Sequence, residues 1–255
     1  MRPDKRTSST AADTSDGARN LSGDELTAAA LASFSHCASD RLTQVMTSLV
    51  KHLHAFVDEA QLTEEEWTRG IVFLTRVGHI TTDQRQEFIL LSDVLGVSMQ
   101  VIGINNQRPP GATESTVFGP FFTANSPRFA NGDDLAHGAP GEPCFIEGYV
   151  RSLEGTPIAG ARIEVWQADD EGRYDVQYDD LPAPRGRGHL YSDGEGRYSF
   201  WSLRPTAYPI PDDGPVGELL AASQRSPMRP AHVHFMITAP GYHPLITHVF
   251  AEGDP

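Results

Sequence analysis

The sequence predicts a mainly β protein in two parts, a helical N-terminal region followed by a β-sandwich domain. Between residues 24 and 105, apolar side chains recur every three or four positions, as they do on one face of a helix. From residue 108 onward, proline and glycine separate short alternating segments, which is typical of an all-β domain. We therefore expect a tail over 1–22, a helical domain over 23–107 and a β-sandwich domain over 108–255.

The composition limits the class of protein. The chain has 255 residues, of which 39% are hydrophobic, enough for a packed core. Its formal net charge of -14 argues against a nucleic-acid-binding surface, and no apolar run is long enough to span a membrane. The first 22 residues are rich in Ser, Thr, Ala and Asp, so we expect a mobile tail and no secretory signal. We expect a cytoplasmic protein in which Cys37 and Cys144 are buried, unpaired thiols.

The helical region divides into several predicted helices. Residues 42–57 carry apolar side chains at helical spacing. A second helix is expected after Thr63, because Thr63 and Glu66 form a capping-box pattern. A third is expected from an acidic start at Thr82-Asp83 and continues through Val101. We expect some of the apolar stripes to face a partner chain.

Six strands are predicted in the β domain, at a spacing that suits a sandwich. They cover residues 144–152, 162–168, 189–192, 198–203, 232–239 and 245–250. No internal repeat is apparent in the sequence.

His232 and His234 form a candidate metal site. Alternate residues of a strand face the same side, so both imidazoles point one way while the residues between and after them point into the core. A pair of hydrogen-bonded strand histidines would show the same spacing, so both interpretations stay open. His52 and His54 lie in a helical segment, where positions two apart do not share a face, and we interpret them as solvent-facing.

The spacing does not settle the remaining ligands. With no cysteine near the pair, structural zinc is disfavoured. A carboxylate such as Asp193 or Glu218 would complete an Fe(II) site. Tyr174 and Tyr208 are further candidates, because each follows a strand end among turn residues, where site residues often lie. A lone loop tyrosine is more often a packing residue, so the tyrosines stay open as well.

Several motifs, taken in order, resemble the intradiol ring-cleaving dioxygenases. These are the segment 163–168 leading to Tyr174, the run Asp193-Gly194-Glu195-Gly196-Arg197-Tyr198, then Tyr208, the run Arg229-Pro230-Ala231-His232-Val233-His234-Phe235, and Ala239-Pro240-Gly241. The resemblance implies a β-sandwich that bears one Fe(III) per subunit, held by Tyr174, Tyr208, His232 and His234. It also implies that Tyr208 acts as general base and that Arg229 stabilises charge developing on the substrate ring.

Within that family, segments 114–122 and 208–217 are most similar to the branch that acts on hydroxyquinol (benzene-1,2,4-triol). The resemblance implies ring cleavage with O2 to 3-hydroxy-cis,cis-muconate (maleylacetate). The substrate pocket that it implies is formed by Leu90, Asp93, Val117, Phe118, Gly119, Pro120, Phe121, Ile210, Pro211 and Arg229. A buried carboxylate needs a donor, and the third hydroxyl of the triol would supply one to Asp93. A solvent-facing or Arg-paired Asp93 is the equal alternative.

The resemblance has two departures and further implications. His248 stands where other branches carry a glutamine near the iron, so we expect it beside the metal rather than on it. Relatives usually continue past the point where this sequence stops, so we expect a final strand or part of the substrate cover to differ. The family also implies a homodimer formed through the helical region, with phospholipid bound there.

Three other functions are weighed against this one. A catechol or chlorocatechol substrate would give cis,cis-muconates. A non-catalytic β-sandwich binding module would use the tyrosines for packing alone, and would hold no iron. A zinc or Fe(II) enzyme built on the two histidines and a carboxylate would keep its metal without Tyr208.

Overall fold

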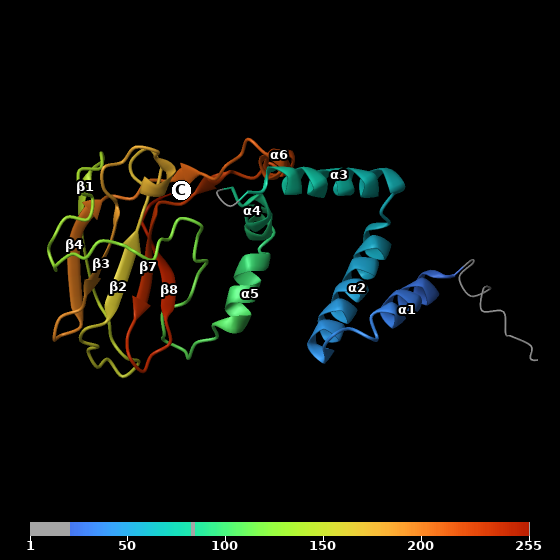
Figure 1. The fold of residues 1–255 in the computed structure, drawn as a ribbon, viewed down its shortest axis with the longest axis horizontal. Helices are drawn as coiled ribbons and strands as arrows, with labels where there is room; N and C mark the ends of the chain where they lie inside the picture. The colour runs from blue at the N-terminus through green and yellow to red at the C-terminus, as the bar shows by residue number, and fades with distance from the viewer. Residues whose placement is uncertain (1–20, 83–84, 255) are drawn as a thin grey trace, which may run out of the picture. The chain divides into compact units, whose positions relative to one another are not determined.

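The computed structural model describes residues 21–82 and 85–254, and the chain divides into two compact units, Met1–Val72 and Phe73–Pro255 (Figure 1). The predicted order, helices first and sheets afterwards, is confirmed. The helical domain expected over 23–107 is shared between the two units, and its role in dimerisation stays a prediction. Nearly all of the predicted tail lies outside the described residues.

The first unit consists of helices whose starts are set by side-chain caps. Helix α1 is Gly23–Ser33, α2 is Asp40–Ala60, and α3, Glu64–Ile80, begins in this unit and runs on into the next. The capping box predicted for α3 is present, since Thr63 Oγ1 accepts from the Glu66 N–H at 3.2 Å and the Thr63 N–H donates to the Glu66 carboxylate at 2.9 Å.

The interpretation of His54 as solvent-facing is wrong. Its Nδ1 lies 2.8 Å from Thr27 Oγ1 of α1, and the side chain is half-buried, whereas His52 is exposed as expected. The helical spacing separates the two histidines correctly. It does not reveal that α1 packs against the side of α2 that carries His54.

After the end of α3, the second unit contains two short helices where one was predicted. Helix α4 is Glu87–Val94 and α5 is Val97–Asn105. Between them Gly96 has a φ of 74°, a conformation that glycine adopts without the cost of a Cβ, and the helix stops there. The start predicted at Thr82-Asp83 is wrong for Thr82, because the helix begins at Glu87, and Asp83 lies outside the described residues.

No helix of the described residues is by itself long and apolar enough to cross a membrane. Helices α4 and α5 meet the length and composition only when they are taken together, and the chain bends by 79° between them.

All six predicted strands are present, with limits shifted by at most a few residues. The two larger sheets contain β1 (Pro143–Tyr149), β4 (Arg197–Leu203), β3 (Arg187–Tyr191), β2 (Arg162–Trp166), β7 (His232–Thr238) and β8 (Leu245–Phe250). Strands β1 and β4 pair with each other, and the second sheet has the antiparallel order β3-β2-β7-β8 (Figure 1). The elements that were not predicted include β5 (Tyr208–Pro209), β6 (Met228–Arg229) and α6 (Pro215–Ala222).

The main core lies between the four-stranded sheet and the β1-β4 pair. On β7 the side chains of Val233 and Phe235 enter this core together with Phe200 of β4. Because side chains alternate along a strand, His232 and His234 are left on the opposite face of the sheet. That face is buried as well, so both imidazoles lie out of water.

Candidate metal centre

Four buried side chains close a ring of donor atoms on this second face of the sheet. Tyr174 Oη lies 2.9 Å from Tyr208 Oη and 2.9 Å from His234 Nε2. His232 Nε2 lies 3.2 Å from His234 Nε2 and 3.3 Å from Tyr208 Oη. Each of the four residues is less than a tenth exposed. The structure therefore brings together all four residues that the resemblance implied as ligands.

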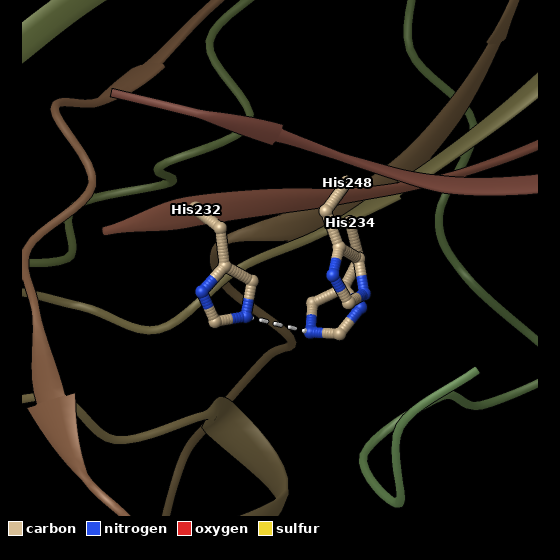
Figure 2. A group of neighbouring side chains, drawn as sticks. All are labelled: His232, His234 and His248. Atoms are coloured by element: carbon tan, nitrogen blue, oxygen red, sulfur yellow. Dashed lines mark hydrogen bonds between the residues drawn. The ribbon is translucent and has the colours of Figure 1, made fainter. Parts of the chain in front are cut away.

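Strand register positions the two histidines. His234 lies opposite Trp166 of β2 on one side and His248 of β8 on the other. The Trp166 indole stacks on the His234 ring, with centroids 4.8 Å apart and planes 12° apart. Figure 2 shows His232 and His234 side by side on their strand, with His248 beside His234. Neighbouring strands thus hold the His234 ring between two aromatic groups.

The two tyrosines reach the ring from different elements. Tyr174 follows β2 after a short turn, donates its N–H to Gln177 Oε1 at 2.8 Å, and stacks on Phe121 with ring centroids 4.5 Å apart. The sequence predicted that Tyr208 lies in a loop, but it lies in β5, where it pairs with Arg229 of β6. A two-residue strand carries too little periodicity to be seen in a sequence.

The protonation of His232 leaves a nitrogen lone pair facing the centre of the ring. His232 Nδ1 donates to the Pro230 carbonyl at 2.6 Å, so its Nε2 carries no proton when the ring is neutral. Burial lowers the pKa of His232 to about 4 and also lowers the pKa of His234. Burial raises the pKa of Tyr174, which keeps that phenol protonated in the absence of a cation.

This donor set fits a single metal ion. Metal–ligand bonds of about 2 Å at near right angles separate neighbouring donor atoms by about 3 Å, and the sides of the ring measure 2.9–3.3 Å. Imidazole nitrogen is a ligand for iron, and phenolate oxygen is an iron ligand in other proteins. The His232 Nε2 lone pair faces His234 Nε2 at 3.2 Å, so a cation between the two nitrogens would bind that lone pair.

The carboxylates that the sequence left as alternative ligands are engaged elsewhere. The Asp193 carboxylate accepts from the backbone N–H groups of Glu195 and Arg197 at 2.9 and 2.8 Å. Glu218 pairs with Arg76 at 2.5 Å on an exposed surface. The site is therefore a nitrogen and phenol site, which is the donor set of neither a structural zinc site nor a two-histidine, one-carboxylate site.

His248 lies beside the ring of donors and outside its four sides. Its ring centroid is 4.2 Å from that of His234, and the candidate ligand nitrogens of His232, His234 and His248 lie within 4.8 Å of one another. Burial lowers the pKa of His248 to about 3. Within the described residues, His248 Nε2 and His234 Nδ1 are buried without a hydrogen-bond partner.

The residues expected around the substrate fall into two groups. Near the ring of donors, Arg229 Nη1 donates to Tyr208 Oη at 3.3 Å, and a Cβ added to Gly119 would lie 2.9 Å from His234 Cε1. On α4, Leu90 packs against a cluster built on Val77, Leu91 and Val216. Asp93, on the same helix, is exposed in the structure, as in the solvent-facing alternative, and is not a buried carboxylate.

The rest of the expected pocket lies in two segments near the tyrosines. Phe118 and Phe121 pack against Trp166 and Tyr174, with ring centroids 5.7 and 4.5 Å apart, and Val117 and Pro120 belong to the same segment. Ile210 donates its N–H to the Pro227 carbonyl at 2.9 Å, and Pro211 follows it. Sequence reasoning assigned no role to Trp166, although its place opposite His234 follows from strand pairing alone.

The chain matches known proteins over most of its length. A family model described as "Dioxygenase" matches residues 117–255, and one described as "Catechol dioxygenase N terminus" matches residues 39–113. A hydroxyquinol 1,2-dioxygenase of Nocardioides simplex is 59% identical over 88% of this chain and 76% of that protein. A 6-chlorohydroxyquinol 1,2-dioxygenase of Cupriavidus pinatubonensis is 55% identical over 90% of this chain and 83% of that protein. The crystal structure of hydroxyquinol 1,2-dioxygenase from Pseudomonas putida DLL-E4 is similar with a TM-score of 0.89 at 47% identity, covering 91% of this chain and 82% of that one.

Proposed function

Because the chain belongs to the family of intradiol ring-cleaving dioxygenases, we propose that it cleaves hydroxyquinol between its two adjacent hydroxylated carbons. Both atoms of O2 enter the product, 3-hydroxy-cis,cis-muconate, which is a tautomer of maleylacetate. The observation that carries the proposal is the closed ring of two phenol oxygens and two imidazole nitrogens. The high identity to relatives named for hydroxyquinol supports this choice of substrate.

The family is iron-dependent, and we propose that one Fe(III) per subunit is held by Tyr174, Tyr208, His232 and His234. When bound, ferric iron would supply a Lewis-acidic, redox-active centre for the two adjacent oxygens of the substrate. The protein surrounds the donor atoms with buried and half-buried aromatic side chains. Phe121 covers Tyr174 and Trp166 covers His234, which keeps water from the donor atoms.

Two side chains are placed to handle proton and charge. Tyr208 Oη lies at one corner of the ring and is the proposed acceptor for a proton from a substrate hydroxyl. Arg229 Nη1 donates to that same oxygen at 3.3 Å and supplies a positive charge where the ring of the substrate would become electron-rich. The proposed pocket completes the site with the segments around Phe118, Phe121 and Ile210 and with Leu90 and Asp93 of α4.

Oxygen uptake by the iron-loaded protein tests the activity. Hydroxyquinol, 6-chlorohydroxyquinol, catechol and 4-chlorocatechol are supplied in parallel, and the absorption spectrum of each product is recorded. Uptake is expected to be fastest with one of the two triols. Faster uptake with a catechol would favour the catechol or chlorocatechol alternative, and no uptake with any of the four would overturn the assignment.

We also propose a cytoplasmic homodimer that forms through the helical region and holds phospholipid there. On α2 the apolar side chains Leu42, Val45, Leu49, Leu53, Phe56 and Val57 are all exposed in the single chain. So long an apolar stripe supports an interaction surface. Cys37 and Cys144 are free and half-buried rather than fully buried, which suits a reducing compartment. Light scattering is expected to give twice the monomer mass, and solvent extraction is expected to release phospholipid.

A further inference from the structure

The chain contains the same six-residue turn twice, which corrects the prediction that it has no internal repeat. Asp169-Asp170-Glu171-Gly172-Arg173-Tyr174 and Asp193-Gly194-Glu195-Gly196-Arg197-Tyr198 differ only at the second position. The first copy ends at a tyrosine of the donor ring. The second ends at Tyr198, which packs in the main core.

The two copies have the same backbone structure. In the first, the Asp169 N–H donates to the Arg173 carbonyl at 2.9 Å, and one Asp169 carboxylate oxygen accepts from the Glu171 and Arg173 N–H groups, each at 3.1 Å. In the second, the matching distances from Asp193 are 2.9, 2.9 and 2.8 Å. One carboxylate oxygen is therefore enough to close the turn.

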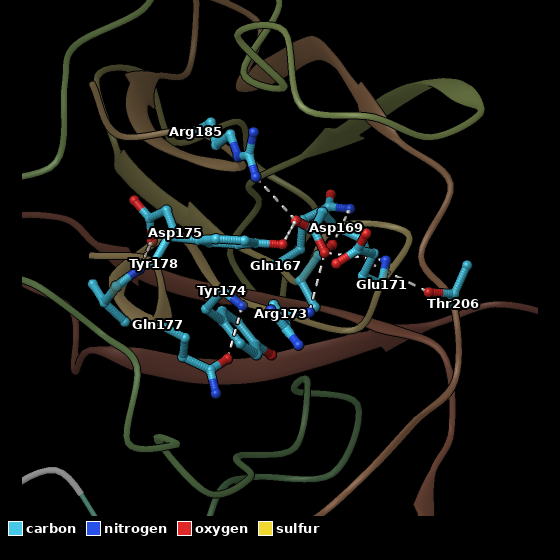
Figure 3. Close-up of polar contacts among 12 residues, drawn as sticks. Gln167, Asp169, Glu171, Arg173, Tyr174, Asp175, Gln177, Tyr178, Arg185 and Thr206 are labelled. Carbon is cyan, nitrogen blue, oxygen red and sulfur yellow. Dashed lines mark hydrogen bonds and ion pairs between the residues drawn. The ribbon is translucent and has the colours of Figure 1, made fainter. Parts of the chain in front are cut away.

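The other oxygen of Asp169 has a separate set of partners. It accepts from Tyr178 Oη at 2.7 Å and from Arg185 Nη2 at 3.4 Å, and the residue is 6% exposed (Figure 3). Tyr178 is the donor, because a carboxylate only accepts, and this hydrogen bond raises the pKa of Tyr178. Asp193, in contrast, is exposed. The first turn is thus anchored to the protein interior in a way that its copy is not.

The anchored turn contacts both tyrosines of the donor ring. It leads directly into Tyr174 through the chain. On its other side Gly172 has a φ of 77°, and a Cβ built there would lie 2.5 Å from Tyr208 Cβ. Thr206, two residues before Tyr208, donates to the Asp169 carbonyl at 3.4 Å. A displacement of this turn would therefore move both phenol oxygens.

We propose that Asp169 is a positioning residue, which acts through Tyr178 and Arg185 to hold the turn that sets both phenols at the metal centre. This inference rests on the proposed function. Outer partners of metal ligands typically change metal affinity about 10–100-fold when they are removed. We expect the anchoring oxygen of Asp169 to have an effect of this size, although it touches no donor atom.

Asp169→Asn and its matched control Asp193→Asn test the proposal. In each, the amide oxygen still closes the turn, but only Asp169→Asn removes the acceptor for Tyr178 and Arg185. After reconstitution with ferric iron, the wild type is expected to bind iron and to show a visible tyrosinate-to-iron absorption band. Asp169→Asn is expected to weaken iron binding about tenfold and to shift the band, while Asp193→Asn leaves both unchanged. Tyr178→Phe, which leaves the turn itself intact, is expected to shift the band in the same direction.

A second pair of variants distinguishes an effect on the position of the tyrosines from a loss of stability. Gly172→Ala and Gly196→Ala each place a side chain at a φ near 76°, since the two values are 77° and 75°. A Cβ at Gly196 would lie 2.5 Å from the Val150 carbonyl, and its nearest neighbours include neither Tyr174 nor Tyr208. Both variants should melt at lower temperature, but only Gly172→Ala should shift the absorption band. If the absorption band has the same position in Asp169→Asn, Tyr178→Phe and Asp193→Asn, the role of Asp169 is overturned and the proposed function stands. If the wild type itself binds no iron or shows no band, both are overturned.

Discussion

Tyr174 must exchange a proton for a metal ion if the donor ring binds iron. Burial raises the pKa of its phenol, whereas burial lowers the pKa of His232 to about 4. Above pH 4 the histidines therefore offer lone pairs without losing a proton, and the phenol does not. We expect iron uptake to release at least one proton per ion, so iron affinity should increase as the pH rises from 6 to 8. An indicator dye in weak buffer measures the release, and uptake without released protons would contradict the ligand role of Tyr174.

Removing the hydroxyl of Tyr174 and removing that of Tyr208 are expected to have different effects on iron binding and turnover. Tyr174→Phe removes a fully buried proposed ligand and should abolish most iron binding and the visible band. Tyr208→Phe also removes the proposed base, so turnover per bound iron should fall about 10²–10⁴-fold. Tyr242→Phe, at a side chain that is 51% exposed, is the control and should change neither. Iron content, band position and oxygen uptake are measured together, and an active Tyr208→Phe protein would exclude the proposed base.

Asp93 is the residue through which we expect substrate choice to act. It is exposed in the structure, so its carboxylate is free of the cost of burial until a ligand covers it. Asp93→Ala should lower kcat/KM for hydroxyquinol about tenfold or more, with a smaller loss for catechol, which lacks the third hydroxyl. Each substrate controls for the other in the same protein. Equal losses on both would remove Asp93 from substrate selection.

At the level of secondary-structure elements, a buried carboxylate joins the start of α4 to the start of α6. Glu87 is 1% exposed, accepts from the Val216 N–H at 3.1 Å, and pairs with Arg85 at 3.2 Å. Gly214, just before α6, leaves room for both side chains, since a Cβ there would lie 2.6 Å from each of them. Removing the carboxylate would leave a buried N–H group without its acceptor.

We therefore expect Glu87→Ala to lower the free energy of unfolding by about 2–3 kcal/mol, the usual cost of an unsatisfied buried group with a lost charged partner. Asp213→Ala is the control, because Asp213 pairs with the same Arg85 but its side chain is 73% exposed. That change should cost less than about 1 kcal/mol. Urea unfolding measures both, and equal losses would mean that the buried contact with α6 contributes little.

The strands show how a sheet builds the donor ring at the scale of elements. Strand β7 supplies the two histidines of the donor ring from one face, and its neighbours β2 and β8 bring Trp166 and His248 against His234 through register alone. A slip of one residue in β7 would exchange His232 and His234 for Val233 and Phe235. The apolar residues of this strand thus fix the register that builds the site. A slip would turn Val233 and Phe235 out of the main core and toward the donor ring.

For the whole molecule, iron is expected to act as a stabilising ligand. An ion present at about a hundredfold excess over its Kd stabilises the folded state by about 2.7 kcal/mol, which corresponds to roughly 5–11 °C for a chain of this size. Removal of iron by a chelator should lower the melting temperature by that amount, and re-addition should restore it together with the visible band. The Tyr174→Phe protein is the control and should respond to neither step. If the melting temperature of the wild type does not change when iron is removed or added, tight binding at the donor ring is contradicted.

The sequence by itself determined the features that depend on near neighbours in the chain. The alternation around His232 predicted which side chains share a face, and Thr63 with Glu66 predicted the start of α3, because both depend on residues only a few positions apart. All six predicted strands are present for the same reason. The two tyrosines came only from the resemblance to a family, since nothing local distinguishes a ligand tyrosine from a packing one.

Only the tertiary structure decided which distant groups meet. It joined Tyr174 and Tyr208 at 2.9 Å, paired Tyr208 with Arg229 in strands too short to show a period, and placed the half-buried His54 against Thr27. The repeated turn is the clearest case, because two nearly identical segments have the same backbone and different surroundings. Local sequence sets the conformation of each turn, but burial and long-range contacts, which no short segment encodes, place one beside the donor ring and the other at the surface.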